Sequence, residues 1–273
     1  MGSQIVRSAA SLRRLLAAGC LLVVLLCPAQ ESAFLFLETK VAENVSLLED
    51  GFYVQGSRLL RLADSAVPYY DASMHGGVSA LDACNPFKIL LFSAPFQQIR
   101  YVDNRLTPIS DAFSLAGMGL GEAACVCASA QGGFWVYDRW QEKLLRFDEK
   151  GRRVAASERF ADLSLQGVNP CYLREVDARL VVCDSVAGLL FFDVFGNFIT
   201  QYPKLGLRAF TVHKDQIVFV EGGSVVFLRV ATMERVKTLA LPVGGVWKIA
   251  VPYLLMRNGD LWRFGELDPS VSH

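Results

Sequence analysis

The sequence has no excess of charge of either sign. Its 273 residues include 27 Lys and Arg against 27 Asp and Glu, which gives a formal net charge of zero. A nucleic-acid-binding protein normally carries a basic surplus that neutralises phosphates, so no nucleic acid is expected as a partner. Charged residues make up only 20% of the chain and apolar residues 52%. This composition excludes a disordered chain and allows a large buried core.

Histidine and the common ligand-binding motifs are also scarce. The three histidines, His75, His213 and His273, are far apart in sequence, whereas a hydrolytic triad or a zinc site needs a His with partners close in space. The glycines of residues 117–121 are not followed by Lys-Ser or Lys-Thr, so they do not form a phosphate-binding loop. The Asp-x-Asp-x-Asp pattern of a calcium loop is absent. The sequence therefore predicts no catalytic, cofactor-binding or metal-binding residues.

The one long hydrophobic run lies near the N-terminus. Three arginines precede an apolar stretch at residues 15–27, which is shorter than the roughly 20 residues of a membrane-spanning helix. A basic segment followed by such a stretch is typical of a secretory signal peptide. We expect cleavage after Ala29, so that residues 1–29 are the signal peptide and residues 30–273 form a single mature domain.

Two alternatives for the N-terminus remain open. The segment could be retained as an uncleaved anchor, or the chain could be lipidated at Cys20, because residues 16–20 resemble a bacterial lipobox. Both alternatives tether the protein to a membrane through its N-terminus. In every case the predicted location is the periplasm or the cell envelope.

An apolar strand that ends in an aromatic or apolar residue, often followed by Asp, recurs along the rest of the chain. The copies lie roughly 35 to 45 residues apart, which is the length that four short strands and their turns occupy in one β-propeller blade. Turn residues separate the strands, and no stretch has the 3.6-residue apolar period of a helix with caps at both ends. The six copies are residues 59–62, 99–103, 144–148, 189–193, 226–230 and 261–264.

These repeats predict an all-β fold, a six-bladed β-propeller. The sixth blade begins near Val246 and lacks an outer strand, whereas residues 34–41 form a spare apolar strand at the mature N-terminus. We expect this N-terminal strand to close the last blade, since closure covers edges that would otherwise invite aggregation. A β-sandwich is the alternative, but sandwiches lack a six-fold register of four strands.

Two of the repeats resemble the NHL repeat. Residues 135–138 followed by 144–151 have its strand ending in Val-x-Asp, its strand ending in Phe-Asp and its glycine turn, and residues 181–196 contain a shorter match. The whole chain is also similar to signal-bearing envelope propeller proteins of the Bacteroidota. The resemblance implies a propeller that serves as a binding platform, and it supplies no catalytic residues.

Five cysteines remain after removal of the signal peptide, so at least one thiol is free. Cys171 and Cys183 lie on adjacent predicted strands. A three-residue hairpin loop would place them opposite each other and allow a disulfide, whereas a two-residue loop would turn them to opposite faces. Both arrangements are open. Cys125 and Cys127 share one strand face, and we expect them to be buried.

Two neighbouring residues are candidates for contact with a partner. Trp140 follows Arg139 in a predicted turn, where burial is not expected, and an exposed Trp beside an Arg is typical of binding surfaces. The recurrent aspartates at positions 138, 148, 184 and 193 are assigned instead to turns, which Asp caps with its own side chain.

The sequence favours a non-enzymatic, extracytoplasmic binding or scaffold propeller whose ligand is a protein or a small molecule. One alternative is a propeller enzyme, a hydrolase or lyase, with its site at the channel mouth. Another is a lipid-anchored component of envelope assembly.

Overall fold

The structure is a computed structural model of the chain. It describes residues 36–40, 45–47, 52–55, 57–61, 69–241, 246–250, 253–258 and 261–266. The predicted signal peptide, residues 1–29, and the candidate lipidation site Cys20 lie outside these ranges.

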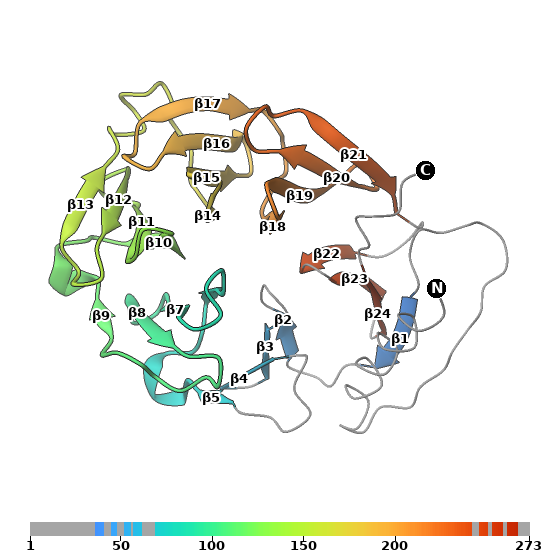
Figure 1. The fold of residues 1–273 in the computed structure, drawn as a ribbon, viewed down its shortest axis with the longest axis horizontal. Coiled ribbons are helices and arrows are strands. Elements are labelled where there is room, and N and C mark those ends of the chain that lie inside the picture. The colour runs from blue at the N-terminus through green and yellow to red at the C-terminus, as the bar shows by residue number, and fades with distance from the viewer. Residues whose placement is uncertain are drawn as a thin grey trace, which may run out of the picture. The chain divides into compact units, whose positions relative to one another are not determined.

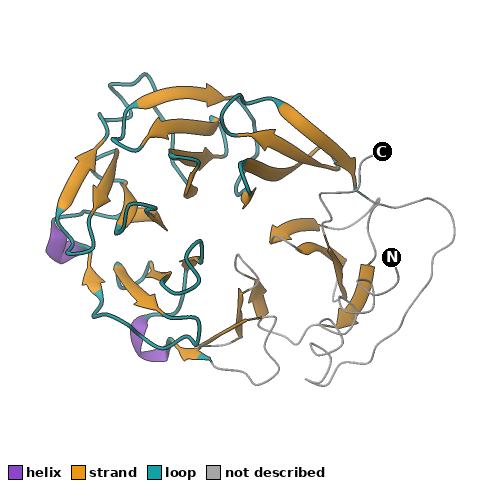
Figure 2. Cartoon of the chain, in the orientation of Figure 1, coloured by secondary structure: helices purple, strands orange, loops and turns teal. Residues whose placement is uncertain are grey.

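Nearly all regular structure in the described chain is β-strand, arranged as six four-stranded sheets (Figures 1 and 2). In each sheet the neighbours in space are neighbours in sequence, apart from the one sheet that includes β1. We call the sheets blades 1 to 6 in chain order. The strand content and the four-strand repeat confirm the predicted all-β fold.

The chain divides into two compact units, and blades 2 to 4 belong to the second of them, which spans residues 72–219 and 227–237. Blade 2 consists of β6 (Ala80–Asp82), β7 (Ile89–Ser93), β8 (Gln98–Val102) and β9 (Phe113–Ser114). Blade 3 consists of β10 (Ala123–Ala128), β11 (Phe134–Asp138), β12 (Lys143–Phe147) and β13 (Arg153–Ala156). Blade 4 consists of β14 (Tyr172–Val176), β15 (Arg179–Asp184), β16 (Gly188–Asp193) and β17 (Phe198–Tyr202).

Blades 1, 5 and 6 also consist of four strands each. Blade 1 consists of β2 (Val45–Leu47), β3 (Phe52–Gln55), β4 (Arg58–Arg61) and β5 (Tyr70–Asp71). Blade 5 consists of β18 (Thr211–His213), β19 (Gln216–Glu221), β20 (Ser224–Arg229) and β21 (Arg235–Ala240). Blade 6 consists of β22 (Val246–Ala250), β23 (Tyr253–Asn258), β24 (Leu261–Glu266) and β1 (Phe36–Lys40).

The N-terminal strand closes the last blade, as predicted. Strand β1 pairs antiparallel with β24, so that Phe36 lies opposite Gly265 and Lys40 lies opposite Leu261. Pairing covers one edge of β24 that would otherwise expose unpaired backbone groups.

Helical structure is limited in the described residues to two short 3-10 turns. These are η2 (Ser73–His75) and η3 (Ala116–Met118) (Figure 2). No helix in the described parts of the chain has the length and hydrophobicity needed to span a membrane.

The middle strands of blades 2 to 4 are buried on both faces. Along β11, Phe134 and Val136 belong to an apolar cluster shared with blade 2, whereas Trp135 and Tyr137 belong to a cluster shared with blade 4. Because successive side chains of a strand point to opposite faces, this strand reads as a continuous apolar run. The apolar residues are continuous along β11 because one face of the strand packs against blade 2 and the other against blade 4.

Both cysteines of β10 lie in the cluster between blades 3 and 4. Cys125 and Cys127 are buried there among aromatic and aliphatic side chains, which confirms the prediction made from their spacing. Burial raises the pKa of both thiols, so they stay protonated at neutral pH and act as small apolar residues.

Phe160 tests the packing between blades 3 and 4. Its ring stacks on Phe192 at 5.5 Å between centroids and lies 5.0 Å from the ring of Tyr137. We expect Phe160→Ala to lower the free energy of unfolding by about 3 to 5 kcal/mol, because it leaves a cavity in a fully buried site. Denaturant titration measures this loss. The exposed Phe87, replaced by Ala, is the control, and equal midpoints for the two variants would contradict the packing described.

Candidate functional site

A buried carboxylate holds the turn between the second and third strands of blade 3. Asp138 ends β11 and is fully buried. Its Oδ1 accepts the backbone N–H of Trp140 at 2.9 Å and that of Gln141 at 3.3 Å. Its Oδ2 accepts the N–H of Gly121 at 2.8 Å. The side chain therefore joins this turn to the loop that leads into the same blade.

Blade 4 repeats this arrangement. Asp184 ends β15, and its Oδ1 accepts the N–H groups of Val186 at 2.7 Å and Ala187 at 2.6 Å. Its Oδ2 accepts the N–H of Asn169 at 2.8 Å. The predicted turn-capping role of these aspartates is confirmed, and each also fixes an incoming loop. Blade 2 has Ser93 at this position, and there Ser79 on the incoming loop accepts the N–H of Ala94 instead.

These turns and loops lie at the same end of their blades, because a second-to-third strand turn and a fourth-to-first strand loop meet at one end of an antiparallel sheet. We call this surface the turn face. It comprises residues 94–97, 139–142 and 185–187 from the turns, and residues 72–79, 115–122, 157–171 and 203–210 from the loops.

Two aromatic rings on the turn face rest on glycine backbone while remaining exposed. Trp140 is 76% exposed, and a Cβ added at Gly121 would lie 2.6 Å from its ring. Phe96 is also exposed, and a Cβ at Gly76 would lie 3.0 Å from its ring. Only glycine allows such an approach, so both rings have packing on one side and solvent on the other.

Further apolar side chains on this surface are exposed. Met74 and Leu205 lie on the loops and Val186 lies on the turn of blade 4. The N–H of Gly206 donates to the carbonyl oxygen of Ser185 at 2.6 Å, which brings the loop of Leu205 to the turn of Val186. The turn face thus carries apolar side chains from three successive blades.

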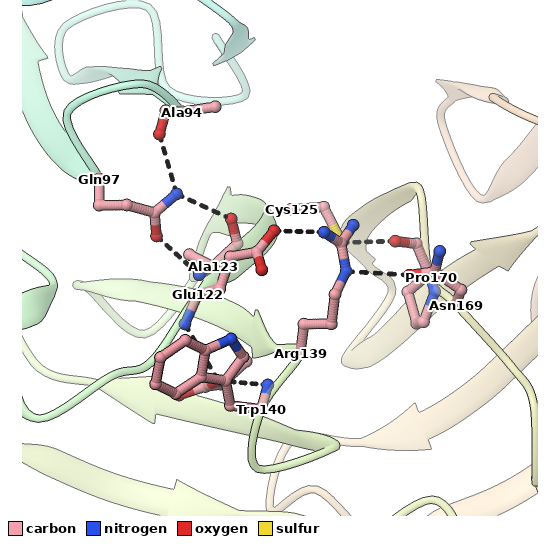
Figure 3. A network of polar contacts seen from close by, with 10 residues as sticks. Ala94, Gln97, Glu122, Ala123, Cys125, Arg139, Trp140, Asn169 and Pro170 are labelled. Carbon is pink, nitrogen blue, oxygen red and sulfur yellow. Dashed lines mark hydrogen bonds and ion pairs between the residues drawn. The ribbon is translucent and has the colours of Figure 1, made fainter.

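Arg139, the predicted contact residue, is engaged within the protein. Its guanidinium pairs with the carboxylate of Glu122, and its Nε donates to Oδ1 of Asn169 at 3.3 Å (Figure 3). The pair is nearly half exposed, so solvent screens it and its contribution to stability is small. The side chain links the turn of blade 3 to the loop of blade 4, and Trp140 beside it is the freer contact residue.

Gln97 makes the corresponding link between blades 2 and 3. Its Oε1 accepts the N–H of Ala123 at 2.7 Å, and its Nε2 donates to the carbonyl oxygens of Ala123 at 3.2 Å and Ala94 at 3.0 Å (Figure 3). Sequence reasoning missed this residue, since no motif marks a glutamine that bonds a strand 26 residues away.

The predicted disulfide residues, Cys171 and Cys183, are free thiols in the structure. The hairpin between their strands has a two-residue loop, since Val176 pairs with Arg179. In a regular strand pair this loop would turn the two side chains to opposite faces. However, Tyr172 pairs with Cys183, and the N–H of Cys171 donates to the carbonyl oxygen of Cys183 at 3.0 Å. The backbone of Cys171 therefore meets that of Cys183 at the end of the strand pair. Their disulfide stays a prediction.

A second polar region lies at the opposite end of blades 2 to 4. Asp82 and Arg174 are both buried, with Oδ1 and Nη2 3.4 Å apart. Asp82 also accepts the N–H groups of Cys84 at 2.9 Å and Ala128 at 3.0 Å. The ion pair connects the first strands of blades 2 and 4 across the end of β10.

A cavity of about 350 Å³ adjoins this ion pair. Lys88 pairs with Glu149 at 2.5 Å, and Glu175 accepts the indole N–H of Trp135 at 2.9 Å. The Sγ of Cys84 lies 3.1 Å from the guanidinium of Arg174. Burial and the Asp82 carboxylate nevertheless raise the pKa of Cys84 to about 12, so this thiol is not a nucleophile at neutral pH.

Histidines and acidic groups do not converge in the described part of the chain. Within those residues, no three His, Cys, Asp or Glu side chains lie close enough to hold a metal ion. His75 lies in η2, and His213 lies on β18 with a buried Nε2 that has no hydrogen-bond partner among the described residues. His273 lies outside the described ranges.

Solved structures similar to this chain are β-propellers. A streptogramin B lyase is 13% identical, with a TM-score of 0.57 over 87% of this chain and 88% of its own. Virginiamycin B lyase from Staphylococcus aureus is 11% identical, with a TM-score of 0.57 over 86% of this chain and 100% of its own. YCF48, solved with a D1 peptide, is 10% identical, with a TM-score of 0.50 over 84% and 78%.

No family model and no curated protein sequence matches the chain. At such low identity the structural likeness establishes the fold alone. The chain is therefore a β-propeller, and proteins of differing function share its architecture.

Asp138 tests how the turn face is held. We expect Asp138→Ala to lower the free energy of unfolding by about 2 kcal/mol, because it leaves several partly buried N–H groups without an acceptor. Thermal or denaturant unfolding measures the loss, with the exposed Asp111, replaced by Ala, as the control. A stability equal to that of the control would show that the carboxylate does not organise the turn.

Proposed function

We propose that this chain is a non-enzymatic propeller that binds a partner protein outside the cytoplasm and that the turn face is its docking surface. The observation that carries the proposal is the placement of Trp140 and Phe96. Each ring is exposed to solvent while its inner face rests on a glycine.

Such placement suits binding more than folding. Exposed tryptophan and phenylalanine rings add little to the stability of the isolated chain, whereas aromatic side chains contribute much of the binding energy of protein interfaces. A ring that is already fixed loses little conformational entropy when a partner covers it, and this preorganisation raises affinity. Trp140 is accordingly the expected centre of the interface.

The ionic groups of the turn face indicate the chemistry of the partner. Arg139 pairs with Glu122, and Arg159 pairs with Glu142 beside the same turn. With these charges neutralised locally, a strongly charged ligand gains little from this surface. The occupant that fits is an uncharged, apolar segment of a protein that contacts the turns of blades 2 to 4.

The extracytoplasmic location in this proposal rests on the sequence. The basic segment and apolar stretch of residues 1–29 favour export, and the resemblance to NHL repeats and to envelope propellers of the Bacteroidota favours a binding platform there. Lipidation at Cys20 would make the protein an envelope assembly component. Mass spectrometry of the membrane fraction distinguishes a lipidated or uncleaved chain from a free periplasmic one.

An enzyme is the second candidate function, and the cavity beside Cys84 is the observation in its favour. The cavity lies at the opposite end of the blades from Trp140. Its Lys88 and Glu149 side chains pair with each other, and the thiol of Cys84 is protonated, so it offers a hydrolase or lyase no activated group. Binding is the better supported function.

Site-specific photo-crosslinking tests the proposal. A benzophenone amino acid is introduced at Trp140 in the full chain, expressed in its own cells, and at Phe87 as the control. Phe87 is also exposed, but it lies on the loop between the first and second strands of blade 2. We expect a discrete protein adduct from position 140 and not from position 87, because only the first lies on the turn face.

A second variant tests whether the orientation of the Trp140 ring matters for binding, in addition to its presence. Gly121→Ala keeps Trp140 but adds a Cβ that collides with the ring, so the same adduct, monitored from a crosslinker at Phe96, should weaken several-fold. Identical adducts from positions 140 and 87, or turnover of a substrate in a hydrolase and lyase screen, would overturn the proposal.

A further inference from the structure

The two cysteines of blade 4 are in contact at the edge of the turn face. Cys171 is exposed and Cys183 is buried. The N–H of Cys171 donates to the carbonyl oxygen of Cys183 at 3.0 Å, and its Sγ lies 3.4 Å from the same oxygen. The two thiols also interact closely enough that each shifts the pKa of the other. Two sulfurs on paired strands are therefore already adjacent.

We propose that Cys171 and Cys183 are a redox-sensitive thiol pair, which a disulfide-containing oxidant converts reversibly to an intramolecular disulfide. The inference does not depend on the proposed function, because it concerns only the chemistry of these two side chains. Formation of the disulfide would end the contact between the Cys171 thiol and the carbonyl oxygen of Arg208, which are 3.1 Å apart.

The accessibility of the two thiols sets the order of the steps. Cys171, as its thiolate, attacks one sulfur of oxidised glutathione and releases one glutathione thiolate, so that a mixed disulfide forms. The Cys183 thiol then loses its proton and attacks the Cys171 sulfur, which expels the second glutathione. Two protein thiols are oxidised, one glutathione disulfide is reduced to two thiols, and the reaction balances.

The electrostatics agree with this order. The hydrogen bond from Cys183 lowers the pKa of Cys171, whereas the same bond and burial raise the pKa of Cys183. The exposed sulfur is therefore the attacking one and the buried sulfur is the resolving one, a division of roles that redox-active cysteine pairs share.

The bond would act on a segment that connects two blades. Residues 169 and 170 precede Cys171, where Asn169 accepts a hydrogen bond from Arg139 and Pro170 accepts one from the thiol of Cys125 at 3.8 Å. A disulfide would fix this segment to β15. By constraining the unfolded chain, it should raise the melting temperature by about 5 °C.

Thiol counting on the full chain tests the proposal. The protein is incubated with oxidised glutathione, alkylated, digested without reduction and mapped by mass spectrometry. We expect a peptide crosslink between Cys171 and Cys183 that dithiothreitol reverses, and a higher melting temperature for the oxidised protein. Cys84, an exposed cysteine outside the pair, is the internal control, and Cys84→Ser should leave the crosslink unchanged.

Two results would overturn the proposal. One is full alkylation of both Cys171 and Cys183 after an oxidation that leaves glutathione on Cys171 in the Cys183→Ser variant. The other is a stable mixed disulfide on Cys171 in the wild-type protein, since resolution by Cys183 would have removed it. Cys183→Ser supplies the reference, because this variant should stop at the mixed disulfide.

Discussion

The turn face depends on one interaction, the buried carboxylate that ends the second strand of blades 3 and 4. Asp138 accepts N–H groups from its own turn and from the incoming loop, and Asp184 does the same in blade 4. Burial of an aspartate is costly unless its oxygens are satisfied. When both oxygens accept hydrogen bonds, the turn and the incoming loop are held against each other. The side chains on both segments are then positioned together.

This constraint explains how exposed aromatic residues can be ordered. Trp140 has no core to hold it, but its backbone is fixed by Asp138 and its ring rests on Gly121. The links through Arg139 and Gln97 then tie each turn to the following blade. A surface built in this way holds its side chains in place before any partner binds, which is the property that the proposed docking function requires.

Much of the fold could be predicted from the sequence, whereas the connections between blades could not. Strand periodicity and turn residues indicated the four-strand repeat, and a spare apolar strand indicated closure by β1. The bonds of Gln97 and Arg139 join residues distant in sequence and depend on how blades pack. The sequence left the length of the hairpin loop at Asp177 and Ala178 open, because both residues adopt a positive φ that an alanine does not signal.

Amide hydrogen exchange on the free protein tests the central claim, that the turn face is ordered before any partner binds. The account predicts that the N–H groups of Gly121, Trp140 and Asn169 exchange slowly, as those of the neighbouring strands do, because buried carboxylates accept them. Exchange of these amides at the rate of an unstructured loop would contradict it. The turn face would then be no preformed docking surface.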